Sequence, residues 1–397
     1  MRNPTKFLAE EYQDLVDRAL DWKLKQLSSA SQPVSIMDGR EVIVLCSNNY
    51  LGLSTHPKLK QAAIEAVEKY GVGSGAVRPI SGTMDVHMEL ERRLARFKNA
   101  EASLTYPTGF MANSGLIPQL VGEQDLIVSD ELNHGSIIDG VRLSKAERLV
   151  YKHNNMESLA QVLDGAEKHN PPYRRILVIT DGVFSMDGDI APMDEIAKLG
   201  REHGAMVYVD DAHGEGVLGE GGRGIISHFK LTHKDVHIEM GTFSKAYGTI
   251  GGHISGSEVL VKFAWNKSRT WLLSSSQPPA IAAATIAAID VLEKEPGHVK
   301  NLWKNTNYFK KAVEDLGFNT GKSQTPIILI IVGESHKAKD LADRLYEEGV
   351  FVVPIVYPMV ARDLARIRIQ MHANLTTQQL NTVIEKLNNI GKKLDII

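Results

Sequence analysis

The sequence of 397 residues contains a single cysteine, Cys46, and this scarcity limits what the chain can be. One cysteine cannot form a disulfide framework or a cysteine metal site within one chain, and it fits a reducing compartment. No run of about 18 apolar residues occurs, so we expect no membrane-spanning helix. The N-terminus lacks the apolar core of a secretory signal and carries several acids, unlike a transit peptide. We therefore expect a cytoplasmic protein.

The chain also lacks a strong charge of either sign. Its formal net charge is -3, so its composition favours neither nucleic acid nor an anionic membrane as a partner. Hydrophobic residues make up 43% and charged residues 23%, which is ordinary for a globular protein. The length predicts one large domain with a smaller one, or two domains of medium size.

The middle of the sequence alternates between amphipathic helical stretches and short apolar runs. Runs such as RILVITDG and MVYVDDAHG end in polar residues and are typical of buried parallel strands. Strands alternating with helices indicate a layered α/β fold. Ligands of such sheets bind beyond the carboxyl ends of the strands, so the polar strand ends should converge on one site.

The last hundred residues have a different residue pattern. Two apolar runs and two helical stretches there predict an α+β unit. An amphipathic pattern at the start of the chain predicts a helix there. We expect an N-terminal helix and arm over residues 1–56, a large domain over 57–290 and a small C-terminal domain over 291–397.

One glycine motif suggests a nicotinamide dinucleotide site. Residues 214–219 match G-x-G-x-x-G and follow a predicted strand, but such a fingerprint should open a helix at once. Here further glycines follow instead of an amphipathic run. An NAD-dependent oxidoreductase is therefore kept only as a remote alternative, together with a non-catalytic binding protein that retains the fold.

Lys245 is the one charged residue in GTFSKAYGTIGG, at residues 241–252. Burial among small residues lowers the pKa of a lysine, and the small side chains let a flat ligand approach. Asp210 and Asp211 end a predicted strand, and alternation should turn one of them toward the site, although either could instead cap a helix. His213 and His134 lie in polar stretches after strands, where an imidazole can stack on a planar ligand or simply be a satisfied surface group.

These groups together fit pyridoxal phosphate (PLP). The cofactor needs a lysine, a carboxylate for its pyridine nitrogen, a stacking ring and a phosphate cradle. Thr108-Gly109-Phe110 opens a predicted helix whose first backbone amides can hold the phosphate. Arg368 is a candidate for binding a substrate carboxylate, although it could equally be a solvated strand residue.

Eight stretches, in order from about residue 40 to 375, resemble the α-oxoamine synthases of the fold-type I PLP enzymes. The resemblance implies a mostly parallel seven-stranded sheet, a smaller α+β C-terminal domain, and a homodimer with its active site at the subunit interface. It also implies an amino acid and an acyl-CoA as substrates. The stretches are SNNYLGL, GSGAVRPISGTMDVHMELE, TGFMANSG, DELNHGSIIDG, TDGVFSMDGDIAP, VYVDDAHGEGVLG, GTFSKAYGTIGG and ARIRIQM.

The resemblance also implies roles for individual residues. Lys245 would form the Schiff base, Asp210 would pair with the pyridine nitrogen, His134 would stack on the ring, and His213 would lie near the phenolic oxygen. The remaining expected residues are the cofactor contacts Gly109, Phe110, Ser185 and Thr242, the substrate contacts Asn48 and Arg368, and Ser275 or Ser276 reaching the partner subunit's phosphate.

Two features bear on which reaction is expected. Many family members follow the substrate arginine with a small residue and Ala-Ala-His, whereas this chain reads His372-Ala373-Asn374-Leu375. GTMD followed by a helix with His87, together with RIRIQM, resembles the glycine C-acetyltransferase branch. We therefore expect condensation of glycine with acetyl-CoA, with 8-amino-7-oxononanoate synthase, from alanine and pimeloyl-CoA, or a dual-specificity enzyme as the alternative.

Overall fold

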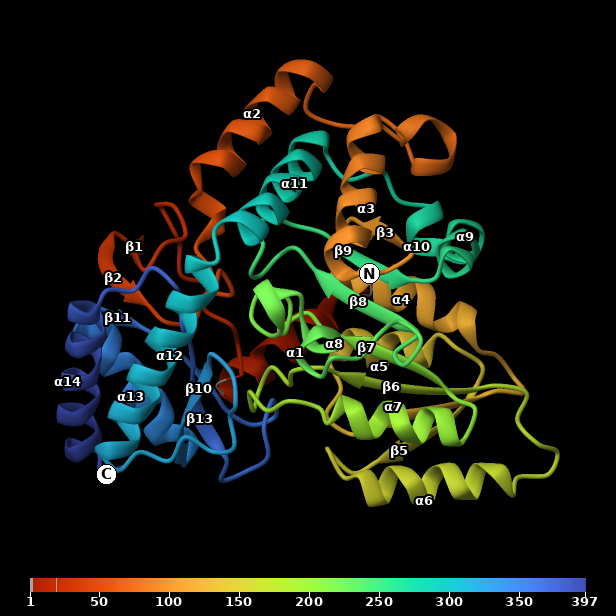
Figure 1. Cartoon of the computed structure of the whole chain (residues 1–397). Helices are drawn as coiled ribbons and strands as arrows, with labels where there is room; N and C mark the ends of the chain where they lie inside the picture. Colours follow the sequence, from red (N-terminus) through yellow and green to blue (C-terminus); the bar gives the residue numbers. More distant parts are fainter. Residues whose placement is uncertain (1–2, 19) are drawn as a thin grey trace.

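The central feature of the computed structural model, which describes residues 3–18 and 20–397, is a seven-stranded sheet (Figure 1). Its strands are β3 (Ala102–Tyr106), β4 (Leu126–Asp130), β5 (Glu147–Tyr151), β6 (Ile176–Asp181), β7 (Met206–Asp210), β8 (Ile238–Thr242) and β9 (Gly252–Gly256). They lie in the order β3-β9-β8-β7-β6-β4-β5. Every neighbouring pair is parallel except the two pairs that include β9. The predicted mostly parallel sheet is therefore confirmed.

Helices cover both faces of this sheet, so its strands are buried on both sides. Along β6, Leu177 and Ile179 pack into one hydrophobic cluster, whereas Val178 packs into the cluster on the opposite face. This alternation follows from the two-residue repeat of a strand. The covering helices are α4 (Gly109–Leu120), α5 (Gly135–Arg142), α9 (Glu258–Lys267) and α10 (Arg269–Leu272) on one face, and α6 (Met156–Glu167), α7 (Met193–Glu202) and α8 (Ile225–His228) on the other.

The C-terminal residues, blue in Figure 1, form a smaller α+β unit beside the large sheet, as predicted. It contains an antiparallel sheet of β10 (Ile327–Gly333), β13 (Ala365–Gln370) and β12 (Val353–Ile355), in that order. Its helices are α12 (Gly297–Asp315), α13 (Ser335–Glu347) and α14 (Thr377–Lys393).

The N-terminal arm joins this C-terminal unit. The strands β1 (Val34–Met37) and β2 (Arg40–Val44) form a hairpin, and β2 pairs in parallel with β11 (Val350–Phe351). The domain limits near residues 56 and 290 stay predictions. The remaining elements are α1 (Lys6–Asp17), η1 (Leu53–Thr55), α2 (Pro57–Tyr70), η2 (Arg78–Gly82), α3 (Asp85–Lys98), η3 (Glu220–Gly222) and α11 (Pro279–Lys294).

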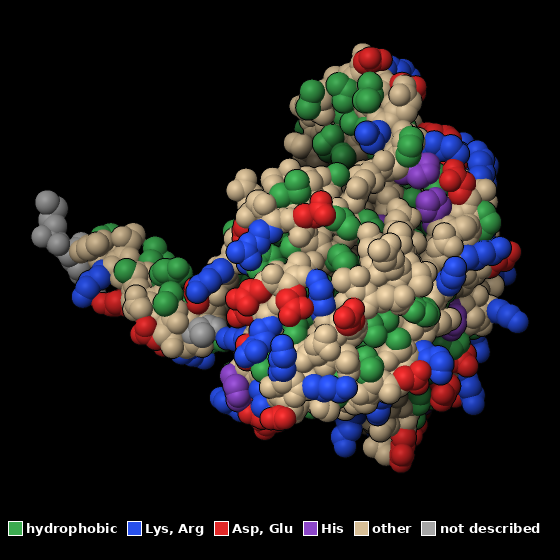
Figure 2. Space-filling model, turned by 90° about the vertical axis from the view of Figure 1, so that its left-hand side faces the viewer, with side chains coloured by type: hydrophobic (Ala, Val, Ile, Leu, Met, Phe, Trp, Pro, Cys, Tyr) green, Lys and Arg blue, Asp and Glu red, His purple; other side chains and the backbone are tan. Residues whose placement is uncertain are grey.

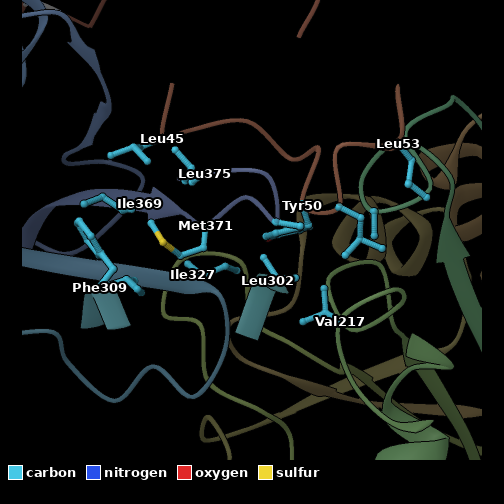
Figure 3. Close-up of a cluster of buried hydrophobic side chains, with 14 of the residues drawn as sticks. Leu45, Tyr50, Leu53, Val217, Leu302, Phe309, Ile327, Ile369, Met371 and Leu375 are labelled. Carbon is cyan, nitrogen blue, oxygen red and sulfur yellow. The ribbon is translucent and has the colours of Figure 1, made fainter. Parts of the chain in front are cut away.

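One hydrophobic core connects the arm, the helices of the large unit and the C-terminal sheet. Figure 3 shows that Leu45 and Tyr50 from the arm lie with Leu302 of α12 and with Ile369 and Met371 at the end of β13. Because protein interiors are closely packed, this core fixes the segment 45–53 against the end of β13. Both segments border the site described below.

The helix α1 is unusual because none of its residues is buried. In Figure 2 the N-terminal segment projects away from the body of the molecule. Within residues 3–18 and 20–397, no helix is both long enough and apolar enough to cross a membrane.

Candidate active site

A cavity of about 240 Å³ opens where β6, β7 and β8 end. Three of the polar strand ends predicted to converge, Asp181, Asp210 and Thr242, line it together. The common edge of parallel strands explains why residues far apart in sequence meet here. The lining residues are Thr108, Gly109, Phe110, His134, Ser136, Asp181, Val183, Ser185, Asp210, Ala212, His213, Met240, Thr242, Ser244 and Lys245.

Lys245 lies in this cavity directly after β8. Burial lowers the pKa of its ammonium group, and the charges of Asp210 and Asp181 oppose that effect. A lysine with a lowered pKa is more often a neutral amine, which is the form that acts as a nucleophile or a base. Lys245 is half-buried, and the lowered pKa expected from the small residues around it is therefore present.

Asp210 and Asp211 diverge at the end of β7. Asp210 lines the cavity, where one carboxylate oxygen accepts a hydrogen bond from Asn113 Nδ2 at 2.8 Å and the other accepts one from the Ala212 backbone at 3.0 Å. Asp211 is not a lining residue; it accepts a hydrogen bond from Ile225 N at 2.9 Å and lies 3.7 Å from Lys98 Nζ. Because successive side chains of a strand point in opposite directions, Asp210 faces the cavity and Asp211 faces away from it.

Asp181 adds a second buried acid to the cavity. Burial raises the pKa of its carboxyl group, and the charge of Asp210 raises it further. One of its oxygens accepts a hydrogen bond from the His134 backbone at 2.7 Å. Two neighbouring buried carboxyl groups favour the binding of a cationic group between or beside them.

The two predicted histidines both line the cavity. His134 caps α5, and its Nδ1 lies 2.7 Å from the Ser136 hydroxyl. Burial lowers the pKa of His134, while the charge of Asp210 opposes the effect. The pKa of His213 is held well below its ordinary value by burial and then by the charge of Lys245. Both shifts favour the neutral imidazole over the charged form.

The N-terminus of α4, where the sequence predicts an anion cradle, lies at the cavity. Thr108 caps the helix by accepting a hydrogen bond from Met111 N at 3.1 Å, which leaves Gly109 and Phe110 at the first turn beside the cavity. A Cβ atom on Gly109 would lie 3.2 Å from Thr242 Cβ, and one on Gly252 would lie 2.5 Å from Gly109 Cα. Small residues on both sides thus allow the helix end to approach the end of β8.

The predicted substrate contacts lie beside the cavity rather than in its lining. Arg368 is on β13, and its Nε is buried without a hydrogen-bond partner among the described residues. The charge of Arg368 acts on both Lys245 and His213, so the three groups are close. Asn48 accepts a hydrogen bond from Gln370 Nε2. An unpartnered guanidinium nitrogen is suited to an incoming carboxylate.

Arg366 differs from Arg368, although alternation predicts that both lie on one face of the strand. It donates hydrogen bonds to Asp187 Oδ1 at 2.6 Å and to the Met186 carbonyl at 3.1 Å. It therefore connects the C-terminal unit to the segment that follows Ser185, a residue that lines the cavity.

Ser275 and Ser276 do not line the cavity of their own chain. Ser276 donates a hydrogen bond to the Ala76 carbonyl at 3.1 Å, and Ser275 forms an isolated bridge with Val77. The cofactor contact predicted for them would have to be made in a second copy of the chain.

The segment that departs from the family pattern is buried except at Asn374, which is exposed. Asn305 Nδ2 donates to the carbonyl groups of His372, Ala373 and Leu375, which holds the turn after β13. Leu375, where many family members have histidine, packs in the core with Leu45 (Figure 3). A leucine there removes a polar group and adds apolar packing.

Sequence reasoning missed three residues that organise the site. Asn113 binds Asp210, and Gln370 and Tyr50 connect Arg368 with His213. All three occur inside the family-like stretches, but no local pattern distinguished them from core residues. The G-x-G-x-x-G stretch at residues 214–219 lies in turns and is followed only by the three-residue η3, so it does not open the helix that a dinucleotide site requires.

Comparisons with known proteins agree with the geometry of the site. Residues 40–387 match the family model described as aminotransferase class I and II. The 8-amino-7-oxononanoate synthase of Symbiobacterium thermophilum is 52% identical over 393 residues, covering 99% of each chain, and that of Thermoanaerobacter pseudethanolicus is 50% identical, covering 98% of each. A solved structure of serine palmitoyltransferase with its PLP internal aldimine superposes with a TM-score of 0.92 at 29% identity, covering 100% of both chains.

These relatives confirm the fold-type I PLP architecture, the cofactor and an enzyme of the α-oxoamine synthase kind. They also correct the expected reaction. Eight full-length relatives at 46–52% identity carry the name 8-amino-7-oxononanoate synthase, so the glycine C-acetyltransferase prediction is wrong and its stated alternative is favoured. The motifs that suggested the acetyltransferase branch are thus also compatible with the 8-amino-7-oxononanoate synthases.

Proposed function

The chain belongs to the aminotransferase class I and II family, and we propose that it condenses alanine with pimeloyl-CoA, as an 8-amino-7-oxononanoate synthase. The observation that carries this proposal is the convergence of Lys245, Asp210, His213 and His134 in one cavity of a chain that shares about half its residues with such synthases. CoA would leave as the thiol, and the carboxyl group of alanine would leave the resulting β-keto acid as CO₂, with a proton taking its place on the carbon.

The residues of the cavity fit PLP. The first turn of α4 offers backbone N–H groups for the phosphate, because a helix leaves its first N–H groups without intrahelical partners. Asp210 offers a carboxylate for a protonated pyridine nitrogen, and His134 offers a flat ring. Bound PLP supplies an electron sink for the negative charge that develops on the amino-acid α-carbon.

The protein's own groups would orient the amino acid and move its proton. Arg368 and Asn48 would hold the carboxylate, since the guanidinium group has an unpartnered buried nitrogen. The lowered pKa of Lys245 would make its Nζ available to accept the α-proton. His213, kept neutral by burial, would donate a hydrogen bond inside the cavity.

The CoA thiol released by purified protein tests this reaction. We expect rapid release with alanine and pimeloyl-CoA, and much slower release with glycine and acetyl-CoA. Similar rates with both pairs, or release only with the second pair, would contradict the proposed substrate choice. Cofactor attachment is tested separately by borohydride reduction and mass spectrometry: Lys245→Ala should lose the reduced adduct, whereas Lys262→Ala, at an exposed lysine paired with Glu258, should retain it.

We also propose that the active unit is a homodimer. The helix α1 is amphipathic, but its apolar face is not covered by other described residues. Half or more of the surface of Phe7, Leu8 and Tyr12 is exposed. A 12-residue helix is marginal in water without tertiary contacts, so this apolar face needs a partner surface. Ser275 and Ser276 lie outside their own cavity, which supports a contribution to the site of a second copy.

Light scattering on chromatographed protein checks the dimer. The full chain should have twice the mass of one chain, and removal of residues 1–18 should weaken the dimer. A monomeric full chain with full activity would overturn this part of the proposal. The cytoplasmic location expected from the sequence stays a prediction.

A further inference from the structure

A continuous set of hydrogen bonds connects the candidate carboxylate-binding residue with a histidine of the cavity. Arg368 Nη1 donates to Gln370 Oε1 at 3.2 Å. Gln370 Nε2 donates to the Tyr50 hydroxyl oxygen at 3.3 Å and to Asn48 Oδ1. The Tyr50 hydroxyl lies 2.9 Å from His213 Nδ1. Gln370 and Tyr50 are each only 1% exposed, so water does not compete for these bonds.

The chemistry of the groups gives this set of bonds a direction. A guanidinium group only donates, so the amide of Gln370 must turn its oxygen toward Arg368 and its NH₂ toward Tyr50. The Tyr50 oxygen therefore accepts from Gln370, which leaves its own proton for His213 Nδ1. A neutral imidazole whose Nδ1 accepts a hydrogen bond carries its proton on Nε2.

The neutral state of His213 has its own cause. Burial and the charge of Lys245 hold the pKa of His213 well below its ordinary value, and the charges of Arg368 and His134 act in the same direction. The ring therefore has one proton, and the hydrogen bond from Tyr50 decides which nitrogen carries it.

We propose that Gln370 and Tyr50 are positioning residues that hold the proton of His213 on Nε2 and connect this histidine with the carboxylate-binding Arg368. This inference rests on the proposed function, because that function makes Arg368 a substrate contact. Since His213 lines the cavity and its Nδ1 is engaged by Tyr50, Nε2 is the donor that it offers to a bound group. Amino-acid capture and hydrogen-bond donation by His213 thus depend on one buried network.

Two substitutions separate the ends of this network. Tyr50→Phe removes the hydroxyl next to His213 and leaves the bond between Arg368 and Gln370 intact. Gln370→Met removes the bonds to Arg368, Tyr50 and Asn48. Tyr106→Phe is the matched control, because its hydroxyl is also fully buried and donates one hydrogen bond, to Ser268 Oγ at 3.0 Å, away from the network.

The test is nitrogen NMR of ¹⁵N-histidine-labelled, PLP-loaded protein, with the His213 signals assigned by their loss in His213→Gln. Wild type and Tyr106→Phe should show His213 protonated on Nε2, whereas Tyr50→Phe and Gln370→Met should show a mixture of the two tautomers. Alanine affinity, followed by the change in visible absorbance, should fall about tenfold in Gln370→Met and stay near the wild-type value in Tyr50→Phe.

Wild-type His213 protonated on Nδ1 would overturn the proposal without any variant being needed. Equal behaviour of Tyr50→Phe and Tyr106→Phe, or unchanged alanine affinity in Gln370→Met, would also overturn it. These measurements need no thioester. A protein that binds alanine with the expected tautomer but releases no CoA would therefore contradict the proposed reaction and leave this inference standing.

Discussion

His153 stabilises the fold in a way that depends on pH, because both of its ring nitrogens bind carboxylates. Nδ1 lies 3.0 Å from Asp130 Oδ1, and Nε2 lies 2.7 Å from Asp189 Oδ2. Asp189 follows Ser185 in the segment that borders the cavity, so His153 anchors this segment to the end of β4. Two donated bonds require a doubly protonated, charged imidazole.

The size and sign of the effect follow from its pKa. Burial alone would lower the pKa of His153, but the hydrogen bonds and charges of Asp130 and Asp189 raise it to about 10. The rise from about 6.5 corresponds to at most about 5 kcal/mol, and partial exposure of the ring (19%) reduces this to about 2–4 kcal/mol. Because the folded-state pKa is raised, this stability is fully present below pH 6.5, declines between 6.5 and 10, and is absent above that range.

Urea unfolding of wild type and His153→Gln at several pH values measures this contribution. We expect wild type to be more stable by about 2–4 kcal/mol near pH 6, with a difference that shrinks steadily toward pH 10. His169→Gln is the control, since His169 is exposed and its Nδ1 donates to the Pro171 carbonyl at 2.6 Å. A difference that stays constant or grows with pH would refute the assigned charge of His153.

Three further substitutions test other contacts. Arg366→Met removes the hydrogen bonds to Asp187 and to the Met186 carbonyl. It should lower the free energy of unfolding, measured in urea, by about 1–3 kcal/mol, and an unchanged value would contradict the anchoring role. Gly252→Ala places a Cβ atom 2.5 Å from Gly109 Cα, which would push the first turn of α4 away from the cavity. It should weaken PLP binding about tenfold in equilibrium dialysis, whereas an alanine at a glycine with open space around it should not. Lys98→Met leaves three buried carboxylates without their shared cation and should cost about 3–5 kcal/mol, or prevent folding, as followed by circular dichroism.

The position of the site was predictable because it follows from strand geometry. Asp181, Asp210 and Thr242 each end an apolar run, and parallel strands bring such ends to one edge. Local chemistry also identified the lysine, since Lys245 is the only charge among small residues. For these residues, short stretches of sequence contain the physical cause of their placement.

The network around His213 was not predictable in this way. Tyr50 and Gln370 are 320 residues apart, and their contact depends on packing between the N-terminal arm and the end of β13. A buried tyrosine and a glutamine within strand-like stretches have the same sequence signal as ordinary core and strand residues. The packing shown in Figure 3, rather than any periodicity, brings them together.

The substrate prediction failed for a related reason. The motifs contain the residues expected to bind PLP and the amino-acid carboxylate. Enzymes that use acyl-CoA substrates of different chain length need the same residues for these two tasks. Selection among acyl chains depends on apolar contacts worth only about 1–3 kcal/mol per methylene, and many different residues can supply them. A stretch such as RIRIQM contains Arg368 and Gln370, which face the amino acid in the proposed function, so it carries little information about the thioester.

Desolvation of the cavity explains why several polar groups are buried together at one edge of the sheet. Asp181 and Asp210 are both buried in one cavity, and burial together with the charge of Asp210 opposes the ionisation of Asp181 unless a cation approaches. Lys245 supplies one such cation when protonated, but its own pKa is lowered by the same burial. The cavity therefore stores an unfavourable arrangement of charge that a bound cationic ring would relieve. Affinity for the cofactor and activation of Lys245 then have a common origin in the desolvation of a single site.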